Sequence, residues 1–292
     1  MSGDSLNNDD DKYCADLVRR YDRDRFLCGL FAPDKVRRHI TALYAFNIEI
    51  ASTRETVSEP LIGQMRLKWW FDALDGIYEG NPPAHQVAVP LGKAVSAGWG
   101  RRDVLENLID ARLLDLDEAP HQTLDDLVEY ADRTSGALSE LVLAGLGVDG
   151  AGARKMARHV GIAHALTGMV RALPLNFARR RVFLPTEVCR QAELEISPLL
   201  DQGMKNGTPP AMISAIEQVL DCARGHLADA RRLKGDVPRG GISAILPGVL
   251  TGGYLKELKK HDNDPFTLPL RPPGPGVGGM LRLVWAAARG TI

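Results

Sequence analysis

The chain has 292 residues, a formal net charge of −1, and 45% hydrophobic and 25% charged residues. These values are typical of a globular protein with a sizeable core, and the near-zero charge argues against nucleic acid as a partner. No stretch reaches the roughly 18 uncharged apolar residues of a membrane-spanning helix, and the polar start of the chain is unlike a signal peptide. The four cysteines form no CxxC pair, which favours reduced thiols and a cytoplasmic location.

Apolar residues recur at helical spacing along nearly the whole chain. Residues 1–12 are polar and acidic, and we expect them to form a flexible terminus. The first two strong helical patterns cover about 36–50 and 64–79. The Asn-Pro-Pro segment at 81–83 should end the second one, because proline lacks a backbone amide hydrogen.

The middle of the chain continues the helical pattern. Asp103 and Thr123 are expected to be N-caps, since their side-chain oxygens can accept hydrogen bonds from the first turn. Pro247 is expected to kink the helix that contains it. The helices are predicted at about 103–116, 124–146, 151–173, 210–234 and 242–259.

The last part of the chain differs in composition. From residue 262 to 279 it is rich in proline and glycine, which predicts a loop or arm, and a short helix follows at about 277–289. Alternation typical of strands is almost absent. The sequence therefore predicts an all-α protein, with one helical domain over 13–260 and the arm and C-terminal helix over 261–292.

Common catalytic motifs such as GxSxG, HExxH and the P-loop do not occur in the sequence. Two segments resemble signatures of the squalene/phytoene synthase family, which are head-to-head prenyltransferases. The segment 43–47 reads LYAFN where the family has YAFCR, and 178–185 reads ARRRVFLP where the family has ARRGRVYLP. The resemblance runs from about Tyr13 to Leu250. It implies an isoprenoid synthase-like helical bundle around a central cavity.

Enzymes of that family use Mg²⁺ to neutralise a diphosphate leaving group, and the ions are held by aspartates one turn apart on two facing helices. In this chain most of the acidic positions are lost, and Ile48 replaces the family's arginine. The resemblance therefore implies no catalytic residue and no metal ligand. The corresponding positions hold Ala51, Ser52 and Glu55 in the first motif, and Ala165, Gly168, Ala172, Leu175 and Asn176 in the second.

Pro174 lies inside the second motif, and we expect it to end or kink that helix. Between residues 150 and 186 there is no acidic residue, but there are seven lysines and arginines. A basic pocket for a phosphate or an anionic lipid would fit this balance, because arginine can contact phosphate with two donors. A solvated or ion-paired surface is the alternative. The ligand-binding candidates are Tyr44, Glu55, Arg171, Arg179, Arg180 and Arg181.

Other segments resemble one branch of the same family, complex I assembly factor 6. The matching segments are AFNIE at 45–49, VSE at 57–59, the Trp69-Trp70 region, NPP at 81–83, and 169–185. This resemblance implies a role in the biogenesis of the respiratory NADH dehydrogenase, complex I. Subunits or assembly intermediates of complex I would be the partners. The start of the chain has no mitochondrial presequence pattern, which favours a bacterial counterpart.

Three functions remain open on the sequence. The preferred one is a non-enzymatic assembly factor that needs no cofactor. The second is an active prenyl-diphosphate transferase in which Glu49 and Glu55 hold Mg²⁺, and the third is an isoprenoid- or lipid-binding protein. Trp285, Arg282 and Arg289 would suit a peripheral contact of the helix at 277–289 with the inner membrane, although docking of that helix on the domain is an equal alternative.

Overall fold

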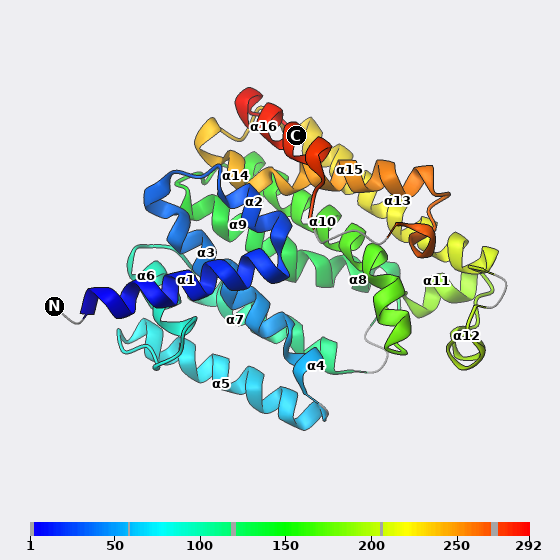
Figure 1. Cartoon of the computed structure of the whole chain (residues 1–292), viewed down its shortest axis with the longest axis horizontal. Helices are drawn as coiled ribbons and strands as arrows, with labels where there is room; N and C mark the ends of the chain where they lie inside the picture. The colour runs from blue at the N-terminus through cyan, green and yellow to red at the C-terminus, as the bar shows by residue number, and fades with distance from the viewer. Residues whose placement is uncertain (1–2, 58, 118–120, 205–206, 270–273) are drawn as a thin grey trace.

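The computed structural model describes residues 3–57, 59–117, 121–204, 207–269 and 274–292. Every regular element within these ranges is a helix, which confirms the predicted all-α class. Figure 1 shows the helices gathered in one bundle, with α16 at the upper edge of the view and α5 at the lower edge. In the described part of the chain no helix is long and apolar enough to cross a membrane.

The first part of the chain forms the layer that carries the first motif. Its central helix is α3, whose residues Ala42–Phe46 are all buried and which packs against α1 and α6. The elements are α1 Gly3–Tyr21, α2 Arg23–Gly29, α3 Asp34–Ala51, α4 Thr53–Thr56, α5 Pro60–Tyr78, α6 Ala88–Ser96, α7 Arg102–Ala111 and the 3₁₀ helix η1 Arg112–Leu116. Because α1 begins at Gly3, the terminus expected to be flexible contains the first turns of a helix.

The remaining elements surround one long helix, α10. They are α8 Leu124–Ala131, the π-helical turn η2 Asp132–Gly136, α9 Ala137–Gly145, α10 Ala151–Ala178, α11 Thr186–Gln191, α12 Ile196–Gln202, α13 Pro210–Arg232, η3 Arg239–Gly241, α14 Ile242–Ile245, α15 Pro247–Lys260, η4 Pro265–Thr267 and α16 Val277–Arg289. Helix α10 packs against α13, α9, α15 and η2. It therefore joins the two halves of the bundle.

A glycine allows α10 to approach the π-helical turn closely. A Cβ atom on Gly161 would lie 2.4 Å from the carbonyl oxygen of Ser135, closer than any side chain tolerates. The part of α10 before Gly161 packs into one hydrophobic cluster, with Met156 and Val160, and the part after it packs into a second cluster, with Leu166 and Val170. The position of α10, and hence of the second motif, depends on this contact.

Two predictions at helix ends differ from the structure. Pro174 does not end α10, which continues to Ala178, because proline removes only one hydrogen bond near the end of a long, packed helix. A kink at Pro174, the other expected outcome, stays a prediction. Asp103 is not the N-cap of α7, which is Arg101; Asp103 lies in the first turn, and its carboxylate pairs with the Arg101 guanidinium.

Two other predictions at helix ends are confirmed. Thr123 caps α8 by accepting from the amide of Asp126, whose side chain accepts from the Thr123 amide in return. Pro247 separates α14 from α15, as the expected kink requires.

In the predicted arm, Phe266 of η4 packs on Phe177 of α10 with ring centroids 5.7 Å apart, and residues 270–273 lie outside the described residues. The division of the chain near residue 260 stays a prediction.

Candidate functional site

The two motif-bearing segments, α3–α4 and α10, are joined at their ends by an ion pair. Ala51 ends α3 and Glu55 lies on α4, while Arg179 follows the last residue of α10. Glu55 Oε2 lies 3.2 Å from Arg179 Nη1. Both side chains are about half exposed, so the pair holds the two segments together only weakly. The structure thus brings two of the sequence candidates into direct contact.

The three successive arginines do not form one surface. Arg180 has a left-handed backbone with φ of 60°, and its guanidinium turns to α12, where it donates to Asp201 Oδ1 at 2.6 Å and to the Leu200 carbonyl at 2.8 Å. Arg181 is partly buried near Arg54. Burial and then Arg54 lower the pKa of Arg181, against the opposite effect of Glu55. The basic group beside Glu55 therefore consists of Arg54, Arg179 and Arg181, without Arg180.

The other two candidates, Tyr44 and Arg171, lie deeper, in the interior between α2, α3, α10 and α15. The Arg171 guanidinium carbon lies 3.6 Å from the centroid of the Tyr254 ring, a cation–π contact. The Tyr254 hydroxyl donates to Asp24 Oδ1 at 2.7 Å. Arg171 is thereby held by an aromatic ring that a carboxylate of α2 orients.

Tyr44 is fully enclosed and lies below the guanidinium of Arg25, whose central carbon is 5.9 Å from the ring centroid. Arg25 is itself buried and makes two short contacts. Its Nη1 lies 2.7 Å from Asp22 Oδ2, and its Nη2 donates to Ser135 Oγ at 2.6 Å. The guanidinium therefore ties α2 to the π-helical turn.

His164 of α10 borders the same interior and contacts α15, with its Nδ1 3.2 Å from Thr251 Oγ1. Burial lowers the pKa of His164 to about 4, and Arg25 and Arg171 add to the effect against Asp24 and Asp22. The imidazole is therefore neutral at pH 7. Burial also raises the pKa values of the Tyr44 and Tyr254 phenols, so both keep their protons. We use the name polar core cluster for Asp22, Asp24, Arg25, Tyr44, Ser135, His164, Arg171 and Tyr254.

The charges of the polar core cluster balance one another. Asp22 and Asp24 supply two carboxylates, and Arg25 and Arg171 supply two guanidinium groups. An anion that entered this region would compete with Asp22 for Arg25 and with the Tyr254 ring for Arg171. The cluster is therefore arranged to satisfy itself rather than to present free positive charge.

One position on α10 near this cluster has open space beside it. A Cβ atom placed on Gly168 would meet no atom within 4 Å, and the residue is partly exposed. Gly168 lies one helical turn from His164 and from Arg171, on the helix that carries the second motif. A larger group therefore fits beside α10 at this point, next to the polar core cluster.

The residues at the motif positions do not fit a magnesium cluster. Within the described residues no group of three or more His, Cys, Asp or Glu side chains is placed to hold a metal. Glu49 Oε2 is bound by Arg66 Nη2 at 2.8 Å, and Glu55 is bound by Arg179. The basic group around Arg181 would also repel a cation. These side chains are therefore not arranged to hold Mg²⁺.

The segment 45–49, which carries the family resemblance, has a structural role in this fold. The Phe46 ring packs edge-on against Trp70 with centroids 5.1 Å apart, and Glu49 binds Arg66 on α5. Asn47 Oδ1 accepts from Arg112 Nη2 at 3.3 Å. These contacts hold α5 and η1 against α3.

Several residues of the site were not predicted from the sequence. Arg25, Asp22 and Asp24 precede an apolar run, and the opposite charges at 22 and 25 have the i, i+3 spacing of a helical ion pair. That spacing could have indicated the ion pair from the sequence. No spacing pattern could have indicated Ser135 or Tyr254, because their partners are 110 and 230 residues away in the chain.

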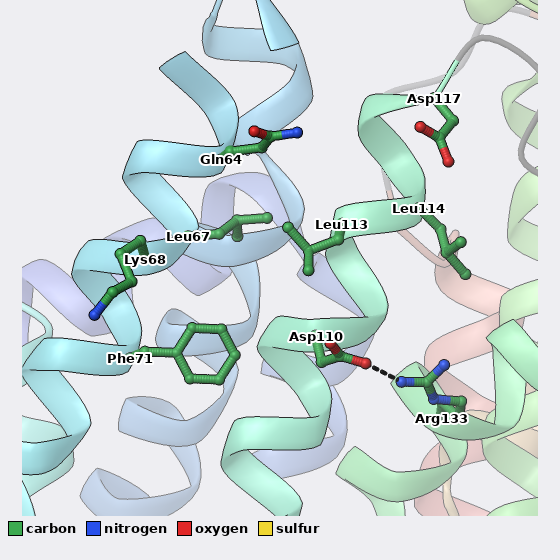
Figure 2. A pocket seen from close by; sticks show the side chains of 9 residues that line it. All are labelled: Gln64, Leu67, Lys68, Phe71, Asp110, Leu113, Leu114, Asp117 and Arg133. Atoms are coloured by element: carbon green, nitrogen blue, oxygen red, sulfur yellow. Dashed lines mark hydrogen bonds and ion pairs between the residues drawn. The ribbon is translucent and has the colours of Figure 1, made fainter. Parts of the chain in front are cut away.

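Two surface grooves are lined by residues that do not belong to the polar core cluster. The larger has a volume of about 550 Å³ and lies between α5 and the α7–η1 segment (Figure 2). In Figure 2, Phe71 and Leu67 of α5 face Leu113 of η1 across it, and two further lining residues, Asp110 and Arg133, pair with each other. The second groove, of about 460 Å³, is lined by His121 and by residues 182–184. Neither groove contains any of the six sequence candidates, whose role in ligand binding stays a prediction.

Comparison with known proteins defines the class. The model of the family described as squalene/phytoene synthase matches residues 18–276. The chain also superimposes on the crystal structure of a dehydrosqualene synthase with a TM-score of 0.78, covering 97% of this chain and 96% of that one, at 15% sequence identity. The chain belongs to the squalene/phytoene synthase family.

Relatives within the family narrow the comparison. The chain is 35% identical over 254 residues to the mouse protein named NADH dehydrogenase (ubiquinone) complex I, assembly factor 6, which covers 87% of this chain and 75% of the relative. It is 26% identical over 235 residues to a 15-cis-phytoene synthase of Synechocystis sp., covering 75% and 67%. The family and branch resemblances predicted from the sequence are both confirmed.

Proposed function

We propose that this chain is a non-enzymatic member of its family that serves the biogenesis of the respiratory NADH dehydrogenase. Its partners would be subunits or assembly intermediates of complex I, and it would need no cofactor. The observation that carries the proposal is the 35% identity with the mouse assembly factor along 87% of the chain. The proposed location is the cytoplasm, with a peripheral contact at the inner membrane.

The side-chain contacts support the non-enzymatic part of the proposal. Ionising a prenyl diphosphate requires cations that neutralise the leaving group. The carboxylates nearest to the motif positions, Glu49 and Glu55, are each held by an arginine, and Asp22 and Asp24 are held by Arg25 and Tyr254. None of them is free to bind a metal without breaking a contact of the fold.

Gene deletion and complementation test the assembly role. We expect a deletion strain to contain less assembled NADH dehydrogenase on native gels and to show less NADH oxidation by its membranes. The Glu49→Gln/Glu55→Gln double variant should restore both, because the proposed role uses no metal. Normal NADH dehydrogenase in the deletion strain would contradict the assembly role.

An enzyme assay tests the alternative transferase function separately. The purified chain is incubated with Mg²⁺ and either farnesyl or geranylgeranyl diphosphate, and the products are extracted and analysed. We expect no condensation product. A product that disappears in the Glu55→Gln variant would establish the transferase reading instead.

A second candidate function is the binding of an isoprenoid or an anionic lipid, and the open space beside Gly168 favours it. The test is mass spectrometry of lipids extracted from the purified chain. Gly168→Leu should remove any bound lipid by filling the space. Gly225→Leu is the matched control, because Gly225 is also a helical glycine without near neighbours but lies on the exposed surface of α13. Equal lipid content in both variants would rule out this candidate.

A further inference from the structure

Helix α16 is apolar on two opposite faces. Its inner face, with Gly279, Leu283 and Ala286, is buried, and the helix packs on α15. The outer face exposes large apolar side chains at the spacing i, i+4, i+7 and i+8, which forms a single stripe along the helix. They are Val277 at 80%, Leu281 at 66%, Val284 at 54% and Trp285 at 56% exposure.

The stripe lies at the edge of the molecule. Figure 1 shows α16 as the outermost helix of the upper edge, lying along α15. The segment after α16 is held in place by Ile292. The Ile292 side chain packs beside Gly248, Val160 and Leu227 in the interior. The exposed stripe therefore belongs to a helix that is fixed to the bundle.

Arginines border the stripe. Arg282 and Arg289 lie on one flank of α16. The Arg282 guanidinium lies over Gly253 of α15, and the Arg289 guanidinium carbon is 4.0 Å from the Trp285 ring centroid. At the two ends of the helix, Arg23 lies against Gly274 and Arg239 against Gly290. Helix α16 contains no acidic residue. Among the described residues, these four arginines make no ion pair.

A second exposed apolar patch, on α5, has a different border. On α5, Leu61, Ile62, Met65 and Trp69 are exposed. The charges beside them are paired and of both signs, namely Lys68 with Asp72 and Asp75 with Arg102 of α7. An apolar stripe with unpaired positive charge is thus a property of α16 and not of exposed apolar residues in general.

We propose that the outer face of α16 docks in the plane of an anionic phospholipid bilayer. Leucine, valine and tryptophan side chains would enter the boundary between headgroups and acyl chains, and the arginines would lie among the phosphates. With 13 residues the helix is about 20 Å long and lies along the surface. This inference rests on the proposed peripheral membrane contact and deepens it by naming the helix face and the lipid class, and bilayer binding can be measured without NADH dehydrogenase.

Vesicle flotation of the full chain tests the apolar stripe. Vesicles of phosphatidylcholine alone are compared with vesicles that also contain phosphatidylglycerol. We expect binding to the anionic vesicles, and about a tenfold or larger loss of binding in the Leu281→Ser/Trp285→Ser variant. The matched control, Leu61→Ser/Met65→Ser on α5, should bind like the unmodified chain. Thermal unfolding confirms that each variant is folded.

A second pair of variants tests the charges. Arg282→Gln/Arg289→Gln should lower binding to anionic vesicles by about tenfold or more and should weaken its dependence on salt, because each basic residue near the surface contributes separately. Neutral vesicles should bind both proteins weakly. The readout is again flotation, now as a function of salt concentration.

Three outcomes would overturn the proposal. One is equal binding by the Leu281→Ser/Trp285→Ser variant and the unmodified chain, and another is equally tight binding to neutral and anionic vesicles. The third is the absence of vesicle binding together with loss of NADH dehydrogenase assembly in the α16 variant, which would make the stripe a protein contact. A failure of the assembly role itself would appear only in the deletion strain.

Discussion

At the scale of single residues, the enclosed guanidinium of Arg25 illustrates how strongly the effect of an ion pair depends on its surroundings. In the Arg25–Asp22 pair the side chains are only 10% and 15% exposed, and Ser135 takes a second donor. In the Glu55–Arg179 pair both side chains are about half exposed. Removing one member of a buried pair leaves the other charge without compensation, whereas an exposed pair contributes little.

Substitution of Arg25 should therefore destabilise the fold. Arg25→Ala leaves Asp22 as an uncompensated charge and Ser135 without its donor, and we expect a loss of about 3 kcal/mol of unfolding free energy in urea titrations. Arg19→Ala is the control, because Arg19 pairs with Asp16 in the same i, i+3 spacing at the surface. That control should cost less than about 0.5 kcal/mol. Similar losses in the two variants would contradict this interpretation.

His164 should make the fold sensitive to mild acid. Its pKa falls from the ordinary 6.5 to about 4 in the folded chain, so the unfolded chain binds a proton first as the pH falls. The contribution of neutral His164 to the unfolding free energy is fully present above about pH 6.5. It is lost progressively between pH 6.5 and 4, by up to about 3 kcal/mol.

The measurement is the urea unfolding free energy at several pH values. His164→Gln should flatten the slope between pH 6.5 and 4, because glutamine does not titrate. An unchanged slope in the His164 variant would show that other groups cause the acid sensitivity.

At the scale of elements, two glycines of α10 should respond in opposite ways to alanine. At Gly161 the new Cβ would lie 2.4 Å from the Ser135 carbonyl oxygen, and we expect a loss of about 2 kcal/mol because backbone must shift. At Gly168 the Cβ meets no atom within 4 Å. Alanine there should stabilise the helix by about 0.8 kcal/mol. Thermal or urea unfolding of both variants tests the difference, and a loss at both sites would mean that Gly168 is not beside open space.

Most helices could be predicted from the sequence, because their buried apolar residues recur at helical spacing along the chain. The helix α16 was predicted at its observed bounds, and α3 within two residues. The interruption of the predicted 124–146 helix by a π-helical turn was not foreseen, since η2 forms against α10 and depends on Gly161 and Arg158 from that helix. The effect of Pro174 on the end of its helix was overestimated for a similar reason, because tertiary packing holds the last turn of α10.

The candidate site was predictable only in part, for a related physical reason. The resemblance indicated Glu55 and Arg179, and the structure places them in contact. Arg180 was grouped with its neighbours, but its left-handed backbone directs it to α12. Arg25 and Tyr254 depend on contacts between distant parts of the chain, which no local pattern encodes.

At the scale of the whole molecule, α16 and the residues after it connect the outer edge of the bundle to its interior. Ile292 lies beside Gly248 of α15, Val160 of α10 and Leu227 of α13. We expect Ile292→Ala to lower the unfolding free energy by about 1 to 2 kcal/mol, less than a fully buried isoleucine would cost. Vesicle binding by the folded fraction should stay the same, because the outer stripe is untouched. Loss of vesicle binding without loss of stability would contradict this separation.

The open space beside Gly168 has a consequence for the heat capacity of a complex. Gly168 is partly exposed, so this space is in contact with solvent. A hydrocarbon chain lodged there would displace water from apolar surface, and such burial lowers the heat capacity. The heat capacity change on binding would therefore distinguish burial of a hydrocarbon chain beside Gly168 from the binding of a headgroup at the charged surface.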